Sequence, residues 1–166
     1  MTPAIILLEK RKIPHTVHAY QHEPSYPSFG LEASEKLGIP PKRVFKTLVV
    51  ALDDGTMVVA IIPVDQTLSM KRLAKAAKAK KAVMADGNAV GKTTGYVLGG
   101  VSPLAQKKSL KTYLDVTAAS QSTIFVSGGR RGLEIELVPA DLLRLTRGVT
   151  AHLCQEESEP AGNDLT

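Results

Sequence analysis

The chain has 166 residues, of which 43% are hydrophobic and 22% charged, and this is enough to form one domain with a sizeable core. No apolar run approaches the roughly 20 residues that span a bilayer, and the first residues lack the order of a secretory signal. The single cysteine, Cys154, cannot form an internal disulfide, which fits a reducing compartment. These features predict a cytoplasmic protein that does not act at a membrane.

Basic residues are concentrated in the first 150 positions. All 21 lysines and arginines lie there, against 12 acidic residues, so that this part has a formal net charge of +9. Residues 151–166 contain four acidic residues and no lysine or arginine. We therefore expect a single domain over residues 1–150 and an acidic, disordered tail over 151–166. A basic body favours an anionic partner, although such a charge also serves ordinary solubility.

In the first half of the chain, capping and turn residues mark the expected elements. Thr2-Pro3 is an N-cap followed by proline at the first helical position, and predicts a helix up to Lys12. We then expect a strand at 16–20, an irregular loop at 21–30 and a short helix at 31–37. Asp53-Asp54-Gly55 then joins two β-branched runs, 47–52 and 57–62, and predicts a hairpin.

In the second half, Ser69 is expected to cap a helix from Met70 to about Ala79, with a basic stripe of lysines on one side. A stretch rich in glycine and threonine follows from Asp86 and leads to the turn Gly99–Pro103. We expect three strands at 113–116, 123–127 and 133–138. A short helix at 139–145 and a last strand near 149 should follow. Strands outnumber helices without regular alternation, which favours an α+β fold with a mixed sheet or partial barrel.

Most familiar catalytic signatures are missing from the sequence. It has no G-x-S-x-G, H-E-x-x-H or C-x-x-C motif, and Gly87 lies one position too late for Gly91-Lys92-Thr93 to end a P-loop. His15, His18 and His22 are unevenly spaced and lack cysteine or acidic support, so we expect neither a metal site nor a cofactor.

Three features could carry chemistry, and each also has a purely structural interpretation. Lys46 begins an apolar strand, and its ammonium could face a cleft or simply lie at the rim of the sheet. The Gly99–Pro103 turn could offer backbone N–H groups to an anion or an ester, or could only connect two elements. The segment Ser127–Gly132, which contains two arginines, could be a ligand-facing loop or a solvated hairpin tip.

Several ordered blocks together resemble the YbaK/EbsC family, the relatives of the editing domain found in bacterial prolyl-tRNA synthetases. The resemblance covers roughly residues 1–149. The blocks that carry it are Met1-Thr2-Pro3-Ala4, Phe29-Gly30, Phe45-Lys46-Thr47-Leu48, Met84-Ala85-Asp86, Thr94-Gly95-Tyr96, Gly99–Pro103, Gln106-Lys107-Lys108 and Ser127–Leu133. It implies a barrel-like mixed sheet flanked by helices, with the 3′ end of a tRNA in a cleft.

The resemblance also implies a site and an activity. Lys46 matches the essential lysine of the family, and Glu134 falls where related proteins have an aspartate. The implied substrate-binding residues are Tyr20, Phe29, Thr47, Gly99, Gly100, Ser127 and Glu134. The implied reaction is trans-editing of Cys-tRNA(Pro), with Cys-tRNA(Cys) as a further candidate substrate. The thiol of the esterified cysteine attacks its own ester, and lyase-like release of a thiolactone is an alternative outcome.

The implied partners are the acceptor end of an aminoacyl-tRNA and prolyl-tRNA synthetase, with no DNA. Two rival interpretations remain open from the sequence. One is deacylation of Ala-tRNA(Pro), because a hydrophobic pocket separates side chains that differ by one group by only ~1–3 kcal/mol. The other is a non-catalytic module that binds RNA or protein on the same fold.

Overall fold

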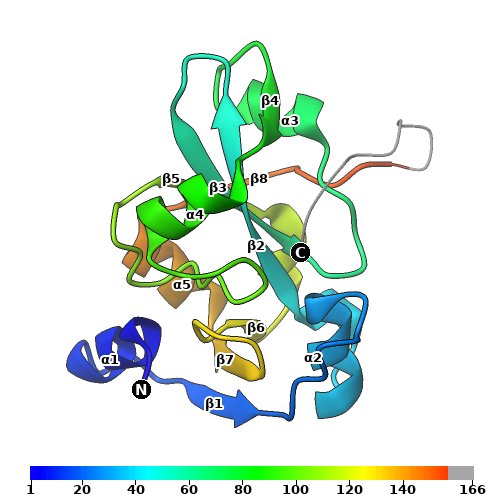
Figure 1. The fold of residues 1–166 in the computed structure, drawn as a ribbon, viewed down its shortest axis with the longest axis vertical. Coiled ribbons are helices and arrows are strands. Elements are labelled where there is room, and N and C mark those ends of the chain that lie inside the picture. The colour runs from blue at the N-terminus through cyan, green and yellow to red at the C-terminus, as the bar shows by residue number, and fades with distance from the viewer. Residues whose placement is uncertain (157–166) are drawn as a thin grey trace.

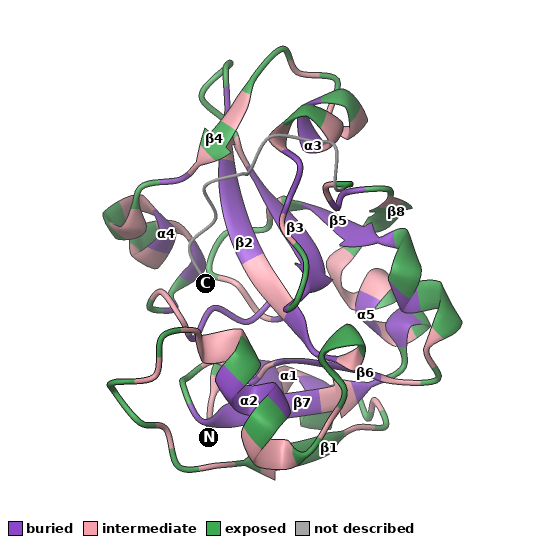
Figure 2. Cartoon of the chain, turned by 90° about the vertical axis from the view of Figure 1, so that its right-hand side faces the viewer, coloured by how far each residue is buried: buried purple, intermediate pink, exposed green. Residues whose placement is uncertain are grey.

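The hairpin that turns at Gly55 supplies two adjacent inner strands of the larger sheet in the computed structural model, which describes residues 1–156 (Figure 1). Strand β2 (Phe45–Leu52) pairs antiparallel with β3 (Met57–Pro63), as predicted. The turn between them needs a left-handed backbone, and Gly55 supplies it with φ +87°. Strand β3 is almost entirely buried, whereas β2 is buried except at Lys46, Thr47 and Ala51, which are half-buried (Figure 2).

The strands of the described residues form two sheets. The five-stranded sheet has the order β4-β2-β3-β5-β8, and the three-stranded sheet has the order β1-β7-β6. Pairing is parallel between β3 and β5 and between β5 and β8, and antiparallel elsewhere, so the predicted mixed sheet is confirmed. A bridge from Val44 to Phe125 joins the two sheets. The remaining strands are β1 (Thr16–Ala19), β4 (Ala82–Met84), β5 (Lys111–Asp115), β6 (Ile124–Ser127), β7 (Leu133–Leu137) and β8 (Val149–Ala151).

Helices cover the sheets, and local capping explains where most of them begin. Thr2 caps α1 with proline at the first position, and Ile5 and Leu8 are buried, as the sequence predicted. Helix α2 begins two residues earlier than expected because the Ser28 hydroxyl accepts from the N–H of Leu31. The α-helices are α1 (Pro3–Lys10), α2 (Phe29–Leu37), α3 (Met70–Ala76), α4 (Gly87–Thr94) and α5 (Pro139–Thr146), and 3₁₀ turns cover Pro41–Arg43 and Val116–Ser120.

Strand β4 and helix α4 were not predicted. Helix α4 is poor in strong helix formers, but the Asp86 carboxylate accepts from the N–H groups of Asn88 and Ala89, and Val90 is buried. Helix α3 ends at Ala76, earlier than expected, and Lys78 has φ +57°. The basic stripe expected along this helix is therefore interrupted before Lys78.

The domain boundary expected at residue 150 is too early. Cys154 is buried and pairs with Leu68, the N–H of Ser69 donates to Leu153 O at 2.8 Å, and that of Gln155 donates to Thr67 O at 2.8 Å. Residues 151–156 therefore belong to the fold. The rest of the expected acidic tail, 157–166, lies outside the described residues. Within residues 1–156, the helices are too short or too polar to cross a membrane.

Candidate functional site

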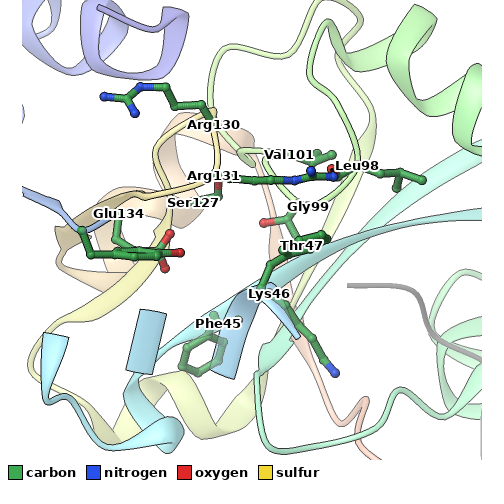
Figure 3. Close-up of a pocket in the computed structure, with 13 residues that line it drawn as sticks. Phe45, Lys46, Thr47, Leu98, Gly99, Val101, Ser127, Arg130, Arg131 and Glu134 are labelled. Carbon is green, nitrogen blue, oxygen red and sulfur yellow. Dashed lines mark hydrogen bonds between the residues drawn. The ribbon is translucent and has the colours of Figure 1, made fainter. Parts of the chain in front are cut away.

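A pocket opens where the beginning of α2, strand β2, the Gly99 loop and the β6–β7 turn meet (Figure 3). It brings together all the predicted site residues except Gly100, from segments that are far apart in the sequence. The pocket is lined by Tyr20, Phe29, Gly30, Phe45, Lys46, Thr47, Leu98, Gly99, Val101, Ser127, Arg130, Arg131 and Glu134.

One wall of the pocket is the ring of Phe29, in the first turn of α2. The guanidinium of Arg131 lies 4.2 Å from the ring centroid, and Arg131 also donates to Leu98 O at 2.8 Å. The imidazole of His22 packs edge-on against the same ring, with centroids 5.6 Å apart. Arg131 thus joins three separate segments of the pocket wall.

A buried carboxylate supports the Phe29 wall from within α2. Glu32 is fully buried and accepts from His22 Nδ1 at 2.6 Å, from the N–H of Glu23 at 2.8 Å and from Lys36 Nζ at 3.0 Å. Burial alone would raise the pKa of Glu32, but hydrogen bonds from Glu23, His22 and Lys36 outweigh it and lower the pKa. Glu32 is therefore an ionised anchor that fixes His22 and the loop before α2.

The glycine loop approaches Phe29 very closely. Gly99 has φ +86°, and a β-carbon there would lie 2.5 Å from Phe29 Cδ2. The expectation that Gly100 offers a free amide to the ester is wrong, because its N–H already donates to Val97 O at 2.9 Å. Gly100 instead allows close packing, since a β-carbon there would lie 2.9 Å from the Cα of Arg130.

Strand β2 directs neighbouring side chains to opposite sides. Thr47 projects into the pocket, and its hydroxyl is buried with no hydrogen-bond partner among residues 1–156. Lys46 lines the edge of the pocket, but its side chain runs away from Ser127 and Glu134 (Figure 3). The Lys46 ammonium is thus placed on the outer side of β2, away from the polar groups at the far wall.

Strands β6 and β7 supply the far wall. Ser127 and Glu134 are directly paired across these strands, so their side chains emerge on the same face. The Glu134 side chain is buried, and burial raises its pKa to about 8. Burial, followed by the negative charges of Glu134 and Glu32, raises the pKa of Tyr20 to about 12. At neutral pH Tyr20 is therefore a neutral hydroxyl.

Sequence reasoning did not single out several lining residues. From the sequence alone, Arg130 and Arg131 could belong either to a ligand-facing loop or to a solvated hairpin tip, and the structure shows both in the pocket lining. Gly30, Phe45, Leu98 and Val101 supply the apolar part. The period of two along β2 places Phe45 and Thr47 on one side and could have identified Phe45.

The pocket lacks the partners that activate a protein nucleophile. Ser127 Oγ accepts from the N–H of Gly129 at 3.2 Å, and no histidine is part of the described lining. His15, His18 and His22 bond separately to Ile13 O, Glu136 and Glu32. Residues 1–156 contain no group of three or more potential metal ligands. The residues present can orient and polarise a bound ester but form no catalytic triad.

Comparison with known proteins gives the family. The model of the aminoacyl-tRNA editing domain matches residues 27–145. EbsC of Enterococcus faecalis, provisionally named a Cys-tRNA(Pro)/Cys-tRNA(Cys) deacylase, is 40% identical over 156 residues, covering 94% of each chain. This chain belongs to the aminoacyl-tRNA editing domain family. The resemblance inferred from the sequence blocks is thereby confirmed.

Solved structures agree with the architecture of this editing domain. A hypothetical protein shares 25% identity and a TM-score of 0.83, over 93% of this chain and all of the other. A protein provisionally described as a trans-editing enzyme for prolyl-tRNA synthetase has a TM-score of 0.78 at 21% identity, covering 94% of this chain and 99% of its own. These likenesses support the fold. All the pocket-lining residues except Tyr20 lie within residues 27–145, the range that the family model matches.

Proposed function

We propose that this editing domain deacylates Cys-tRNA(Pro) in trans, in the cytoplasm, and that the thiol of the esterified cysteine is the nucleophile. The observation that carries the proposal is a pocket that holds polar groups suited to binding an aminoacyl ester but, in its described lining, no histidine that could activate Ser127. The name of the Enterococcus faecalis relative supports cysteine as the amino acid. Cys-tRNA(Cys) is a second candidate substrate for the same reason.

The reaction needs positioning more than it needs a protein nucleophile. The sulfur attacks the carbonyl carbon of its own ester, the bond to the ribose 3′ oxygen breaks, and that oxygen takes the proton that the thiol gives up. The products are deacylated tRNA and a cysteine thiolactone, which water then opens. Orientation of reacting groups can contribute ~7–11 kcal/mol, so a rigid pocket can suffice.

The geometry supports a division of roles among the lining residues. Phe29, held by Arg131 and facing Gly99, offers a flat surface for the terminal base or the ester. The Thr47 hydroxyl lies in the same space and has an unused hydrogen-bond capacity toward a ligand. We assign Lys46 to the 3′-terminal phosphate or ribose, because its side chain starts at the pocket and extends away from Ser127 and Glu134, toward the part of the tRNA that would lie outside (Figure 3).

Single-turnover deacylation of Cys-tRNA(Pro) tests this function. The wild-type protein should release cysteine or its thiolactone, and Lys46→Ala should slow release by ~100-fold or more while the circular dichroism spectrum is unchanged. Lys42→Ala, an exposed lysine in the turn before β2, is the matched control and should retain normal rates. Normal turnover by Lys46→Ala would refute the role given to Lys46.

Two rival functions are separated by the same assay. Faster turnover of Ala-tRNA(Pro) than of Cys-tRNA(Pro) would identify an alanine-specific deacylase. Stoichiometric binding of tRNA without any turnover would identify a non-catalytic module. The buried, unbonded Thr47 hydroxyl in the pocket favours an enzyme, because a module that binds only an RNA backbone has no need of it.

We also propose that prolyl-tRNA synthetase supplies recognition of the tRNA body. The chain has a mass of 17.7 kDa, and its pocket can contact only the acceptor end of a tRNA. Selectivity for tRNA(Pro) should therefore rise when the synthetase is present. Analytical ultracentrifugation should detect a ternary complex, and its absence, with unchanged selectivity, would count against this partnership.

A further inference from the structure

Glu134 is a buried carboxyl group that the protein leaves without a counter-charge. The residue is only 7% exposed, and it lies in the pocket lining (Figure 3). Among residues 1–156 its carboxylate has neither a hydrogen bond nor an ion pair, and burial is the one cause that raises its pKa. A buried charge without a partner costs several kcal/mol, and such a group either keeps its proton or waits for a cation from outside.

Two other glutamates of the fold, one buried and one partly exposed, do have partners. Glu32 is bonded by His22, Lys36 and a backbone N–H. Glu136 lies two residues along the same strand, where it bonds His18, Arg43 and Thr123.

The cations near the pocket do not fill this role. Arg131 is committed to the Phe29 ring and to Leu98 O, and the Lys46 side chain runs away from β7. The side chain of Arg130 is likewise directed away from Glu134 (Figure 3). His18, which is paired with Glu134 across β1 and β7, bonds Glu136 instead. We therefore expect the positive charge that reaches Glu134 to come with the ligand.

An aminoacyl ester carries one suitable cation, the α-ammonium group, two bonds from the ester carbonyl carbon. We propose that Glu134 binds this α-ammonium group and so selects esters of amino acids with a free amino group. The inference rests on the proposed function, since it assumes an aminoacyl ester in the pocket. Ser127, paired directly with Glu134, lies beside this position and can accept or donate a hydrogen bond there.

This contact would also orient the reaction. With the ammonium fixed at β7 and the ribose at β2, the carbonyl carbon is held between two walls, and rotation about the Cα–carbonyl bond is restricted. A substrate with an acylated amino group would bury Glu134 against a neutral amide and would lose the charge pair. The pocket should therefore discriminate against N-acylated and des-amino substrates.

The proposal is tested by a thermodynamic cycle that removes the Glu134 carboxylate from the protein and the amino group from the substrate, separately and together. tRNA(Pro) is charged with cysteine or with 3-mercaptopropionate, which keeps the thiol and the ester but lacks the amino group. Single-turnover kcat/KM is measured for wild type and for Glu134→Gln. Removing either partner should lower it by about 10- to 100-fold, and removing the second should add less than about twofold, because the contact is already lost.

Glu136→Gln is the matched control, since it makes the same chemical change on the same strand outside the pocket, and should retain the preference for the amino substrate. A Glu134→Gln protein that loses equal factors on both substrates would overturn the proposal and indicate proton donation or a structural role. Thermal denaturation of each variant checks folding.

A binding measurement separates this proposal from the deacylase function. Adenosine analogues that carry cysteine, or its des-amino form, through a stable 3′ amide are titrated into wild type and Glu134→Gln. A preference for the amino analogue that Glu134→Gln abolishes supports the contact even if wild type turns over no Cys-tRNA(Pro). Equal binding of both analogues by wild type would refute it even if turnover is fast.

Discussion

Gly99 and Phe29 are in such close contact that a β-carbon at position 99 would lie 2.5 Å from Cδ2 and from Cε2 of the ring. The same position has φ +86°, which L side chains rarely adopt. The loop and the ring are therefore fitted to each other, and the ring is fixed from its other sides by Arg131 and His22. The shape of the pocket depends on the absence of a side chain at Gly99.

Gly99→Ala should therefore lower deacylation activity, beyond what its loss of folding stability explains. The methyl group must displace Phe29 or the loop, and we expect deacylation to fall by ~10-fold or more, with ~1–3 kcal/mol lost in the free energy of unfolding. Gly55→Ala is the matched control, because Gly55 has φ +87° with nothing within 4 Å of a β-carbon. It should lose similar stability in urea unfolding but keep full activity. Equal loss of activity in both variants would contradict the proposed fit.

Arg131→Lys should weaken substrate binding although it keeps the charge. A lysine cannot stack a planar group on Phe29 while donating to Leu98 O, so the wall becomes mobile. We expect KM to rise by ~3- to 10-fold with a smaller change in kcat. Arg11→Lys, at an exposed residue that follows α1 and is not part of the pocket lining, should leave KM nearly unchanged. An unaltered KM for Arg131→Lys would show that the stack is dispensable.

Glu134→Gln should stabilise the protein, and the gain should depend on pH. The pKa of Glu134 is raised to about 8 from an ordinary value of 4.5. Between these values the folded protein holds a proton that the unfolded chain does not, so the free energy of unfolding falls as pH rises. The variant escapes this loss and should gain on the order of 2 kcal/mol at pH 7. Urea unfolding from pH 5 to 8 measures this, and a gain that does not grow with pH would contradict the burial of an unpaired carboxyl group.

Glu32→Gln should lower the free energy of unfolding, in contrast to Glu134→Gln. The pKa of Glu32 is lowered in the folded protein, so its ionised form stabilises the protein at any pH above the ordinary carboxyl pKa. This contribution is lost as the pH falls from the ordinary pKa through the lower pKa of the folded state. The variant should lose ~1–3 kcal/mol at pH 7, because His22 and Lys36 lose a charged acceptor. The difference from wild type should shrink on acidification toward pH 4. A constant difference would exclude the ionised anchor.

Much of the fold follows from local signals in the sequence. The Thr2-Pro3 start and the Gly55 hairpin could be predicted because capping and turn chemistry act between near neighbours. Helix α4 could not, because its sequence is weakly helical and its stability comes from Asp86 and from burial of Val90 among distant residues. The end of the domain was placed too early because the pairing of Leu68 with Cys154 is long-range.

The site was predicted only in part, for a related reason. The sequence blocks identified most lining residues, but they did not reveal that the Gly100 N–H donates a hydrogen bond to Val97 O. The alternating run of β7 makes Glu134 and Glu136 look equivalent. Only the tertiary arrangement distinguishes them, since Glu136 is surrounded by His18, Arg43 and Thr123 while Glu134 is buried in the pocket.

The most direct test of the account is to replace the sulfur of the substrate by oxygen. Single-turnover deacylation is measured for tRNA(Pro) charged with cysteine and with serine, which differ in little more than that atom. If the substrate thiol is the nucleophile, the cysteine ester should be cleaved ~100-fold faster or more, with a thiolactone as the first product. Equal rates for the two esters, or free cysteine formed with no thiolactone, would contradict thiol-assisted editing in this pocket.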